Sequence, residues 1–355
     1  MQIRFYSYLL LAVAGIGLWS CGPARLKDDY IAPLPSEANN KLVVKIQFMN
    51  DVIRSNPNND YYYYKRSLLN LDAERINAAL RDINGAIQRE SSEGKYFFVK
   101  AKVLKEQEEY GEALAAAKAA ERKGFILPEL DMLMGELCYL DSNREDALAY
   151  LRKAQGSLPS HYQIPHYIGS ILVEMEDTTA AVQQLNHALE LYPGNTPTYN
   201  QLIGLYNKYQ APKIALEYAN KGLDLAQPDD LFYYQTGEAV EKVFGIDSSN
   251  YWYDQALRMN KQMWEANIKK ARYELKKGAF SQAETYYKRA LVQKPDIENG
   301  YFELGYIYEY YLDDLDEALV SYKQAATVDS TNTRISWNIR RVIRKINFRE
   351  FSGTF

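Results

Sequence analysis

Small residues recur in this sequence every 34 residues, and the recurrence runs through most of the chain. One column comprises Ala86, Ala120, Ala154, Ala188, Gly222, Ala256, Ala290 and, after one extra residue, Ala325. A second comprises Ala79, Ala113, Ala147, Ala181, Ala215, Ser249, Ala283 and Ala318. A third comprises Ser67, Ala101, Gly135, Gly169, Gly237, Ala271 and Gly305, interrupted where Ile203 replaces a small residue. A period of 34 residues is typical of helix–turn–helix units that stack into a solenoid.

The columns have a physical basis in helix packing. Two antiparallel helices that lie close together need small side chains where their backbones approach and large ones between these points. Large apolar residues recur accordingly, at Tyr63, Phe97, Tyr199, Tyr233 and Tyr301 in the first helix of a unit and at Ile83, Leu151, Leu185, Tyr253, Tyr287 and Tyr322 in the second. Because proline blocks the continuation of a helix, units are expected to end near Pro159, Pro193, Pro228 and Pro295.

The period resembles that of the tetratricopeptide repeat family, and the best matches include Met134-Gly135 with Asp146-Ala147, and Leu304-Gly305 with Tyr308. Eight repeats are counted over residues 60–332, starting near Asp60, Gly94, Pro128, Tyr162, Thr196, Asp230, Trp264 and Glu298. The sixth is the weakest, because Gly245 and the four residues after it replace the usual turn. The resemblance implies an all-α, right-handed superhelical solenoid.

An amphipathic segment flanks the repeats on each side. Residues 37–57 place Leu42, Ile46, Met49 and Ile53 on one stripe, and residues 333–355 place Ile335, Ile339, Val342, Ile343 and Ile346 on one face. We expect both segments to form capping helices, since end repeats must cover the core and meet water. Residues 331–355 carry six basic residues and one acid, whereas residues 298–330 carry eight acids and one lysine. This contrast favours electrostatic docking of the C-terminal cap over contact with anionic lipid or an acidic partner.

The N-terminus has the pattern of a bacterial lipoprotein signal. Arg4 precedes an apolar core from Tyr8 to Leu18, and Leu18-Trp19-Ser20-Cys21 resembles a lipobox. We expect residues 1–20 to be a signal peptide, Cys21 to carry the lipid, and residues 21–36 to form a tether. An ordinary signal peptide is the alternative. Lys27-Asp28-Asp29 resembles the export signal of some surface lipoproteins of the Bacteroidota, although a solvated linker is the favoured interpretation.

The sequence indicates no catalytic site, cofactor or metal. The three histidines, His161, His166 and His187, match no zinc-binding spacing, and neither a glycine-rich phosphate loop nor a nucleophile motif is found. From Cys21 onward the chain has 41 basic and 46 acidic residues, and this net charge of −5 argues against a general nucleic-acid-binding surface. Cys138 lies among apolar residues of a first helix and is expected to fill the core.

Binding is expected on the concave surface that the resemblance implies, which is lined by the first helix of each repeat. The positions carried over as a partner-binding groove are Tyr61, Tyr64, Phe98, Lys102, Met132, Tyr139, His166, Asn200, Tyr234, Arg272, Phe302, Tyr306 and Tyr310. This set is rich in aromatic residues, which supply contact area at low entropic cost. For each single position, packing in the repeat core is the alternative. The lysine-and-asparagine set with which some family members bind a C-terminal carboxylate is missing.

Together these features predict a non-enzymatic scaffold that binds a partner polypeptide in its groove. The expected location is the outer membrane, held by the lipid, with the periplasmic face favoured over the cell surface. Similar repeat lipoproteins serve outer-membrane assembly and secretion. The alternative is a surface receptor for glycan or peptide nutrients, although the constant period leaves little room for the ligand loops that such receptors grow between repeats. An enzyme with a site assembled across repeats is a third possibility.

Overall fold

The computed structural model describes residues 41–352 of the chain, and it builds them from helices joined by short connections. The predicted signal peptide, Cys21 and the predicted tether lie outside the described residues. The described helices form two compact units. The first unit contains α1 (Lys41–Ser55), α2 (Asp60–Asp72) and α3 (Ile76–Arg89). No helix within residues 41–352 is both long enough and apolar enough to cross a membrane.

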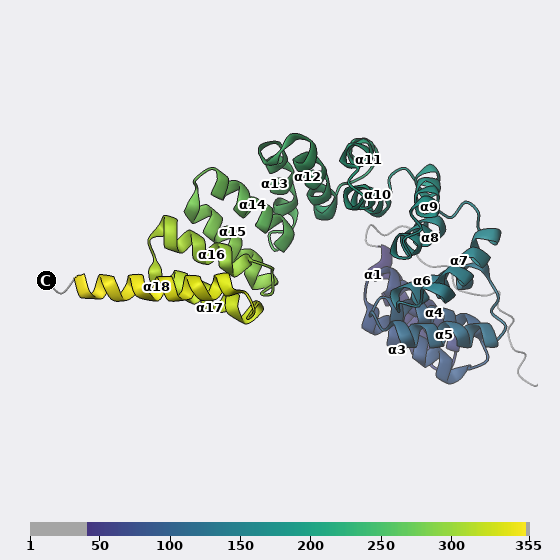
Figure 1. The fold of residues 1–355 in the computed structure, drawn as a ribbon. Coiled ribbons are helices and arrows are strands. Elements are labelled where there is room, and N and C mark those ends of the chain that lie inside the picture. The colour runs from purple at the N-terminus through teal and green to yellow at the C-terminus, as the bar shows by residue number, and fades with distance from the viewer. Residues whose placement is uncertain (1–40, 353–355) are drawn as a thin grey trace, which may run out of the picture. The chain divides into compact units, whose positions relative to one another are not determined.

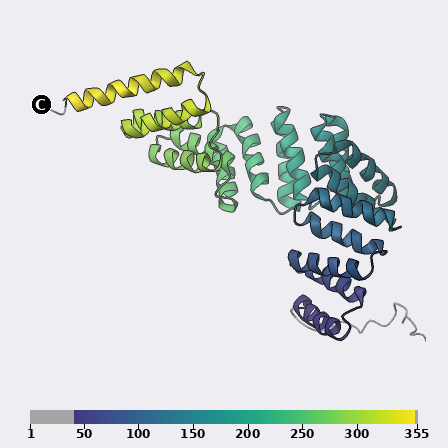
Figure 2. The same ribbon diagram turned by 90° about the horizontal axis from the view of Figure 1, so that it is seen from below.

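The second unit contains the remaining helices. They are α4 (Gly94–Lys105), α5 (Tyr110–Arg122), α6 (Pro128–Leu140), α7 (Arg144–Ser157), α8 (Gln163–Glu174), α9 (Thr178–Leu191), α10 (Thr196–Lys208), α11 (Pro212–Leu225), α12 (Asp230–Phe244), α13 (Ile246–Met259), α14 (Trp264–Lys276), α15 (Phe280–Gln293), α16 (Gly300–Ile307), the π-helix η1 (Tyr308–Leu312), α17 (Leu315–Val328) and α18 (Thr333–Ser352). Consecutive helices pack as pairs, and the pairs stack on one another (Figures 1 and 2). The predicted all-α repeat solenoid is confirmed, with no strand among the described residues.

Every residue in the small-residue columns is buried. At the glycines of the third column the contact is with a large residue of the second helix. A Cβ on Gly135 would lie 2.6 Å from Cγ of Leu151, and a Cβ on Gly237 would lie 2.7 Å from Cε1 of Tyr253. These approaches leave no space for a methyl group, so the second-helix side chain occupies the position that a larger first-helix residue would need.

Ile203 interrupts the third column because its partner in the second helix is small. The position that holds Leu151 and Leu185 in neighbouring repeats holds Ala219 in this one. Ile203 and Ala219 are both fully buried and belong to one hydrophobic cluster. The large and small residues are therefore exchanged between the two helices, and the volume of the pair is preserved.

The turn inside each helix pair contains one residue with a left-handed backbone. These residues have φ between 55° and 76° and follow the repeat spacing at Glu74, Glu108, Ser142, Glu176, Gln210, Gly278 and Asp313. Between α12 and α13 this turn is absent, and Gly245 alone, with φ of 88°, ends one helix and begins the next. The weak sixth repeat in the sequence thus corresponds to a shortened connection, in which glycine adopts a conformation that other residues rarely reach.

The single extra residue in the period is accommodated by a π-helix. Gly305 keeps the spacing of 34, Ala318 comes one residue late, and η1 lies between them. A π turn inserts one residue without breaking the helix. It ends where the Asp314 N–H donates to the Tyr308 carbonyl at 3.0 Å. This turn carries Glu309, which is buried.

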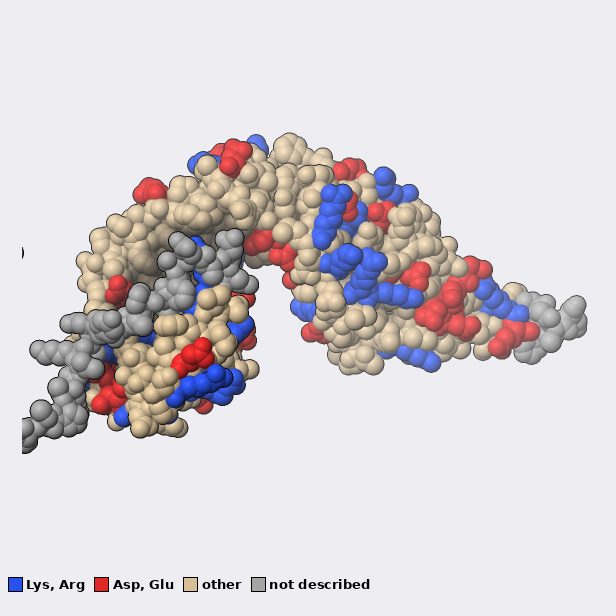
Figure 3. Space-filling view, turned by 180° about the vertical axis from the view of Figure 1, so that it is seen from behind, with Lys and Arg blue, Asp and Glu red and all other residues tan. Residues whose placement is uncertain are grey.

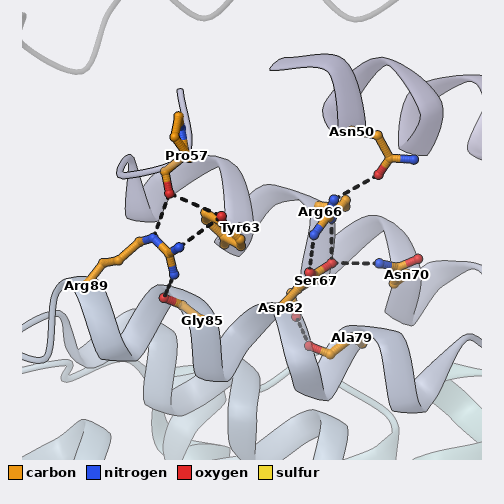
Figure 4. A network of polar contacts seen from close by, with 10 residues as sticks. All are labelled: Asn50, Pro57, Tyr63, Arg66, Ser67, Asn70, Ala79, Asp82, Gly85 and Arg89. Atoms are coloured by element: carbon orange, nitrogen blue, oxygen red, sulfur yellow. Dashed lines mark hydrogen bonds and ion pairs between the residues drawn. The ribbon is translucent and has the colours of Figure 1, made fainter. Parts of the chain in front are cut away.

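In the first unit, Arg66 of α2 links the N-terminal helix to the first helix pair (Figure 4). Its guanidinium donates to Asn50 of α1 at 2.8 Å and to both oxygens of Asp82 of α3, at 2.8 and 2.5 Å. Asn70 donates to the same carboxylate at 2.8 Å, so Asp82 is buried but fully engaged. The contact surface of α1 is formed by the predicted apolar stripe, in which Met49 is almost completely buried.

At the other end of the chain, α18 packs on α17 with Ile335 and Val342 buried. The predicted electrostatic docking of this helix is confirmed. Arg341 and Lys345 bind the carboxylate of Glu309, with Nε–Oε1 and Nζ–Oε1 distances of 2.8 and 2.9 Å. Basic and acidic side chains lie next to one another over the C-terminal repeats (Figure 3).

Candidate functional site

The predicted groove positions are divided between the two units. Tyr61 and Tyr64 lie on α2 in the first unit, where their ring centres are 5.9 Å apart. Lys65 extends over both rings, with its Nζ 5.1 and 5.7 Å from their centres. All other groove positions lie in the second unit, where the first helices α4, α6, α8, α10 and α12 contact one another in sequence.

At the α4 and α6 end of this face, the aromatic positions also contribute to packing. The Phe98 ring centre lies 5.1 Å from that of Phe125, and Lys102 is exposed beside it. Met132 and Tyr139 are partly buried against a hydrophobic cluster of α6 to α9. The Tyr139 hydroxyl donates to Glu174 at 3.2 Å, and burial, followed by this carboxylate, raises the pKa of Tyr139 to about 12. These side chains are therefore shared between the exposed face and the core.

Polar contacts join successive first helices on the same face. Lys105 of α4 and Tyr167 of α8 both donate to Oε1 of Glu136 on α6, at 3.0 and 2.6 Å. Farther along, Nδ1 of His166 lies 2.9 Å from the Thr198 hydroxyl. Burial lowers the pKa of His166 to about 4, so this imidazole is neutral at pH 7. The face is held in register by hydrogen bonds between repeats.

Asn200, a predicted groove residue, does not project from this face. It is buried, and its amide donates to both oxygens of Asp229 at 3.0 Å. Asp229 is the N-cap of α12, where its Oδ1 accepts from the Phe232 N–H at 2.7 Å. The prediction of an exposed Asn200 is therefore wrong, because the side chain is needed to fix the start of the next repeat.

A concavity on the first-helix face lies between α12, α14 and the connection that precedes α16. It is a surface pocket of about 500 Å³. Six first-helix residues line it, and two of them, Tyr234 and Arg272, belong to the predicted groove. The other four are Trp264, Glu265, Ile268 and Lys269, and residues 294 and 296–299 complete the wall. The pocket is large enough to take one or two side chains of a bound polypeptide.

Three acidic and three basic residues line this pocket, and among them only Lys269 forms an ion pair within residues 41–352. Lys269 lies 2.9 Å from Glu241 and 3.7 Å from Glu238, and Lys294 lies over the Trp264 ring at 4.4 Å. Arg272 is exposed and forms no ion pair with any residue in the described part of the chain. An exposed guanidinium beside aromatic surface can bind a carboxylate or a carbonyl group of a partner.

At the C-terminal end of the face, the three predicted positions differ in exposure. Tyr306 and Tyr310 pack with their ring centres 4.6 Å apart, and Tyr310 remains 46% exposed. Phe302, in contrast, is 6% exposed and packs 5.5 Å from the Tyr322 ring. The guanidinium of Arg334 covers its other side at 4.6 Å. The prediction that Phe302 lines the groove is wrong, because α17 and α18 enclose it.

Part of the pocket lies outside the first-helix pattern and does not follow from the sequence. Lys294 and Asp296 line it, although in the sequence they only flank the helix stop at Pro295. The one available signal was the period itself, since Lys294 lies 30 residues after Trp264 and cross-repeat contacts in this chain span about that distance. Which of these loop residues would face the pocket depends on the loop conformation, which the pattern does not contain.

The remaining polar candidates do not form a site. Among residues 41–352 no group of histidine, cysteine and carboxylate side chains has the arrangement needed to hold a metal ion. Cys138 is completely buried in the cluster of α6 to α9, as predicted for a residue that fills the core. Burial is the main cause that raises the pKa of its thiol.

Comparison with known families identifies the repeats. Two family models of the tetratricopeptide repeat match the chain, one over residues 98–162 and 250–298 and the other over residues 167–195 and 299–332. These stretches are tetratricopeptide repeats. Proteins built from such repeats act as scaffolds for protein–protein interaction, and the fold is typically non-enzymatic.

Solved structures show the same tetratricopeptide-repeat fold. The APC/C hetero-tetramer Cut9–Hcn1 aligns with a TM-score of 0.55 and 12% identity over 85% of this chain and 59% of that one. PilF of Pseudomonas aeruginosa aligns with a TM-score of 0.53 and 13% identity, covering 61% and 97%. The C-terminal part of a repeat protein from Cytophaga hutchinsonii gives 0.52 and 18%, covering 68% and 99%. At these identities the likeness shows the fold alone.

One curated protein is also similar in sequence. Human Protein O-mannosyl-transferase TMTC1 is 28% identical over 195 residues, which make up 54% of this chain and 21% of that protein. The match therefore spans about a fifth of the relative's length. It does not establish a transferase activity for the repeats described here.

Proposed function

We propose that this protein is a scaffold that binds a segment of a partner polypeptide along the first-helix face of its second unit. The observation that carries the proposal is the pocket lined by Tyr234, Ile268 and Arg272. It offers aromatic and aliphatic surface together with the Arg272 guanidinium, which forms no ion pair within residues 41–352, and this combination is typical of residues that dominate binding energy at protein interfaces.

The rest of the face supports an extended rather than a globular ligand. Phe98 on α4 and Tyr139 on α6 are only partly buried, Lys102 on α4 is exposed, and the hydrogen bonds between first helices hold this row in a fixed arrangement. A preformed face lowers the entropic cost of ordering a bound segment. An extended or helical stretch of the partner would contact several repeats and place one side chain in the Arg272 pocket.

We further propose that the scaffold works in a bacterial envelope, anchored to the outer membrane by lipid at Cys21 and exposed to the periplasm. The support is the sequence alone: a short apolar segment that ends in Leu18-Trp19-Ser20-Cys21, followed by a proline-containing tether. In this location the repeat array would hold one component of an assembly or secretion complex close to the membrane.

The binding proposal is tested by affinity capture of the full chain from cells, followed by mass spectrometry. Arg272→Glu should reduce recovery of the specific partner at least about tenfold, since interface arginines in desolvated pockets are frequently worth about 2 kcal/mol. Arg258→Glu is the matched control, because Arg258 is equally exposed but lies on the second helix α13. Equal recovery with both variants would show that the partner binds elsewhere. Arg272 suits this test better than Met132 or Tyr139, whose replacement would also disturb the core.

A further inference from the structure

The C-terminal helix α18 has a second face that its docking on the last repeat does not use. Ile335, Asn338 and Val342 are buried against the repeat. Trp337, which is 54% exposed, lies away from this surface, and Phe348, which is 73% exposed, lies at its edge beside η1 and the start of α17. With 20 residues, α18 is longer than the 14-residue α17 and extends past it (Figures 1 and 2).

Two arginines lie between these aromatic residues on the same helical face. Trp337, Arg340, Arg344 and Phe348 follow one another at spacings of three and four residues, so their side chains form a single stripe. Arg340 and Arg344 are exposed, and neither forms an ion pair with a residue in the described range 41–352. Arg341, Lys345 and Arg349, by contrast, are paired with Glu309 and Asp313. Docking of α18 therefore leaves the charge of the stripe unbalanced.

A pocket of about 460 Å³ lies beside the stripe, between α18 and the segment that contains η1 and the start of α17. Four cations and two carboxylates line it: Arg341, Arg344, Lys345, Arg349, Glu309 and Asp313. The excess of two positive charges makes the pocket suitable for an anionic group such as a phosphate.

We propose that the stripe Trp337–Arg340–Arg344–Phe348 and the adjoining pocket bind the surface of an anionic phospholipid bilayer. The arginines and the pocket would contact lipid phosphates, and the two aromatic side chains would enter the interface between headgroups and acyl chains. This combination of an exposed basic stripe with tryptophan and phenylalanine on one helix is typical of helices that lie in a membrane interface.

The lipid contact is independent of the proposed partner site, because it uses α18 and not the first-helix face. It is also independent of lipid at Cys21, since the attraction comes from side chains of the folded cap. Each basic residue held near an anionic membrane contributes about 1 kcal/mol, and the attraction falls with rising salt. Membrane contact through α18 would orient the C-terminal repeats relative to the bilayer.

The test uses the full chain with Cys21→Ser and a local probe, so that any contribution of the N-terminus to membrane binding does not affect the result. A polarity-sensitive fluorophore is attached through Ile343→Cys on α18, or through Arg258→Cys on α13 as the control; Cys138 is buried. The vesicles contain phosphatidylcholine either alone or with an equal amount of phosphatidylglycerol. A shift to an apolar environment is expected only for the probe at position 343, only with phosphatidylglycerol, and less at high salt.

Removing the charges of Arg340 and Arg344 tests whether these arginines cause the response to phosphatidylglycerol. Arg340→Gln with Arg344→Gln should weaken the phosphatidylglycerol response roughly thirty-fold, from about 1 kcal/mol for each charge removed. The matched pair Arg258→Gln with Arg289→Gln, on the exposed side of second helices, should leave it unchanged. An undiminished response in the first pair would overturn the proposal. The proposal would also be overturned if the probe at position 343, on a chain with Arg340 and Arg344 intact, gave no response to these vesicles but responded to polyglutamate. That result would identify an acidic polypeptide as the occupant.

Discussion

Arg341 of α18 donates from Nε to Oε1 of Glu309 in the π-helix at 2.8 Å, and this contact anchors the C-terminal cap. Lys345 and Tyr322 bind the same carboxylate at 2.9 and 3.0 Å. Burial opposes ionisation of Glu309, but the hydrogen bonds from these partners outweigh it and hold the pKa of this carboxyl below its ordinary value. The extra residue in the last repeat thus forms the π-helix η1, and η1 carries Glu309, the carboxylate that α18 binds.

Glu309→Gln should release this cap. The substitution removes the charge that compensates Arg341 and Lys345, and breaking a buried ion pair by changing one partner costs about 3 kcal/mol or more. We expect amide hydrogen exchange throughout α18 to accelerate strongly while exchange in α4 to α9 is unaffected. Glu317→Gln, an exposed position on α17, is the control. Unchanged exchange in α18 would mean that apolar packing alone holds the helix.

The exchange of large and small residues at Ile203 and Ala219 predicts that substitutions at the two positions have strongly non-additive effects on the free energy of unfolding. Ile203→Ala should destabilise by about 2 kcal/mol or more through the cavity it leaves. Ala219→Leu should destabilise by about 1–3 kcal/mol through overpacking. The double variant places alanine on the first helix and a large residue on the second, as with Ala271 and Tyr287, and should be at least about 1 kcal/mol more stable than the sum of the single effects predicts. Denaturant unfolding measures the cycle, and strict additivity would refute the packing explanation.

The lowered pKa of His166 predicts that the folded protein loses stability in mild acid. Burial lowers its pKa in the folded state to about 4, whereas the unfolded side chain titrates near its ordinary value of 6.5. Between these values the unfolded state binds the proton and the folded state does not. The free energy of unfolding should therefore fall as pH decreases from 6.5 towards 4, by up to about 3 kcal/mol from this residue. His166→Gln should make this slope shallower. An NMR titration that finds His166 protonating near pH 6.5 in the folded protein would contradict the prediction.

The lipid anchor proposed at Cys21 predicts a biochemical outcome. Cys21→Ser should abolish labelling of the protein by a fatty-acid probe. It should also release the protein from envelope membranes after a high-salt wash, which removes protein held by electrostatic contacts alone. If the wild-type protein is never labelled, and the variant resists the wash as well as the wild type does, then lipidation does not anchor the chain.

Most of the fold follows from the repeat pattern. The columns of small residues identify where helices approach, and all of them are buried in the structure. The left-handed turn residues share the same period, but they were not recognisable because their identities vary among glutamate, serine, glutamine, glycine and aspartate. The extra residue in the last repeat was visible in the sequence. Its effect, a π-helix rather than a longer loop, depends on the contacts of Glu309, which no local pattern contains.

The candidate site was less predictable than the fold. Periodicity identifies which positions project from the first helices, but not which of them a neighbouring repeat will cover. Asn200 and Phe302 occupy projecting positions, yet Asp229 and Arg334 enclose them. Partners of this kind lie roughly one period apart in the sequence, as with Lys105 and Glu136. Their pairing depends on side-chain length and loop geometry, and these became visible only in the structure.

The central claim is that a partner polypeptide binds the first-helix face of the second unit. The most direct measurement places a photo-crosslinking amino acid at Lys102, Arg272, Arg258 or Arg289 of the full chain in living cells and identifies the adducts by mass spectrometry. The first two positions are exposed on first helices and the last two on second helices. We predict that Lys102 and Arg272 yield adducts with the same partner, and that Arg258 and Arg289 do not. Adducts formed only from the second helices, or equally from both faces, would contradict the claim.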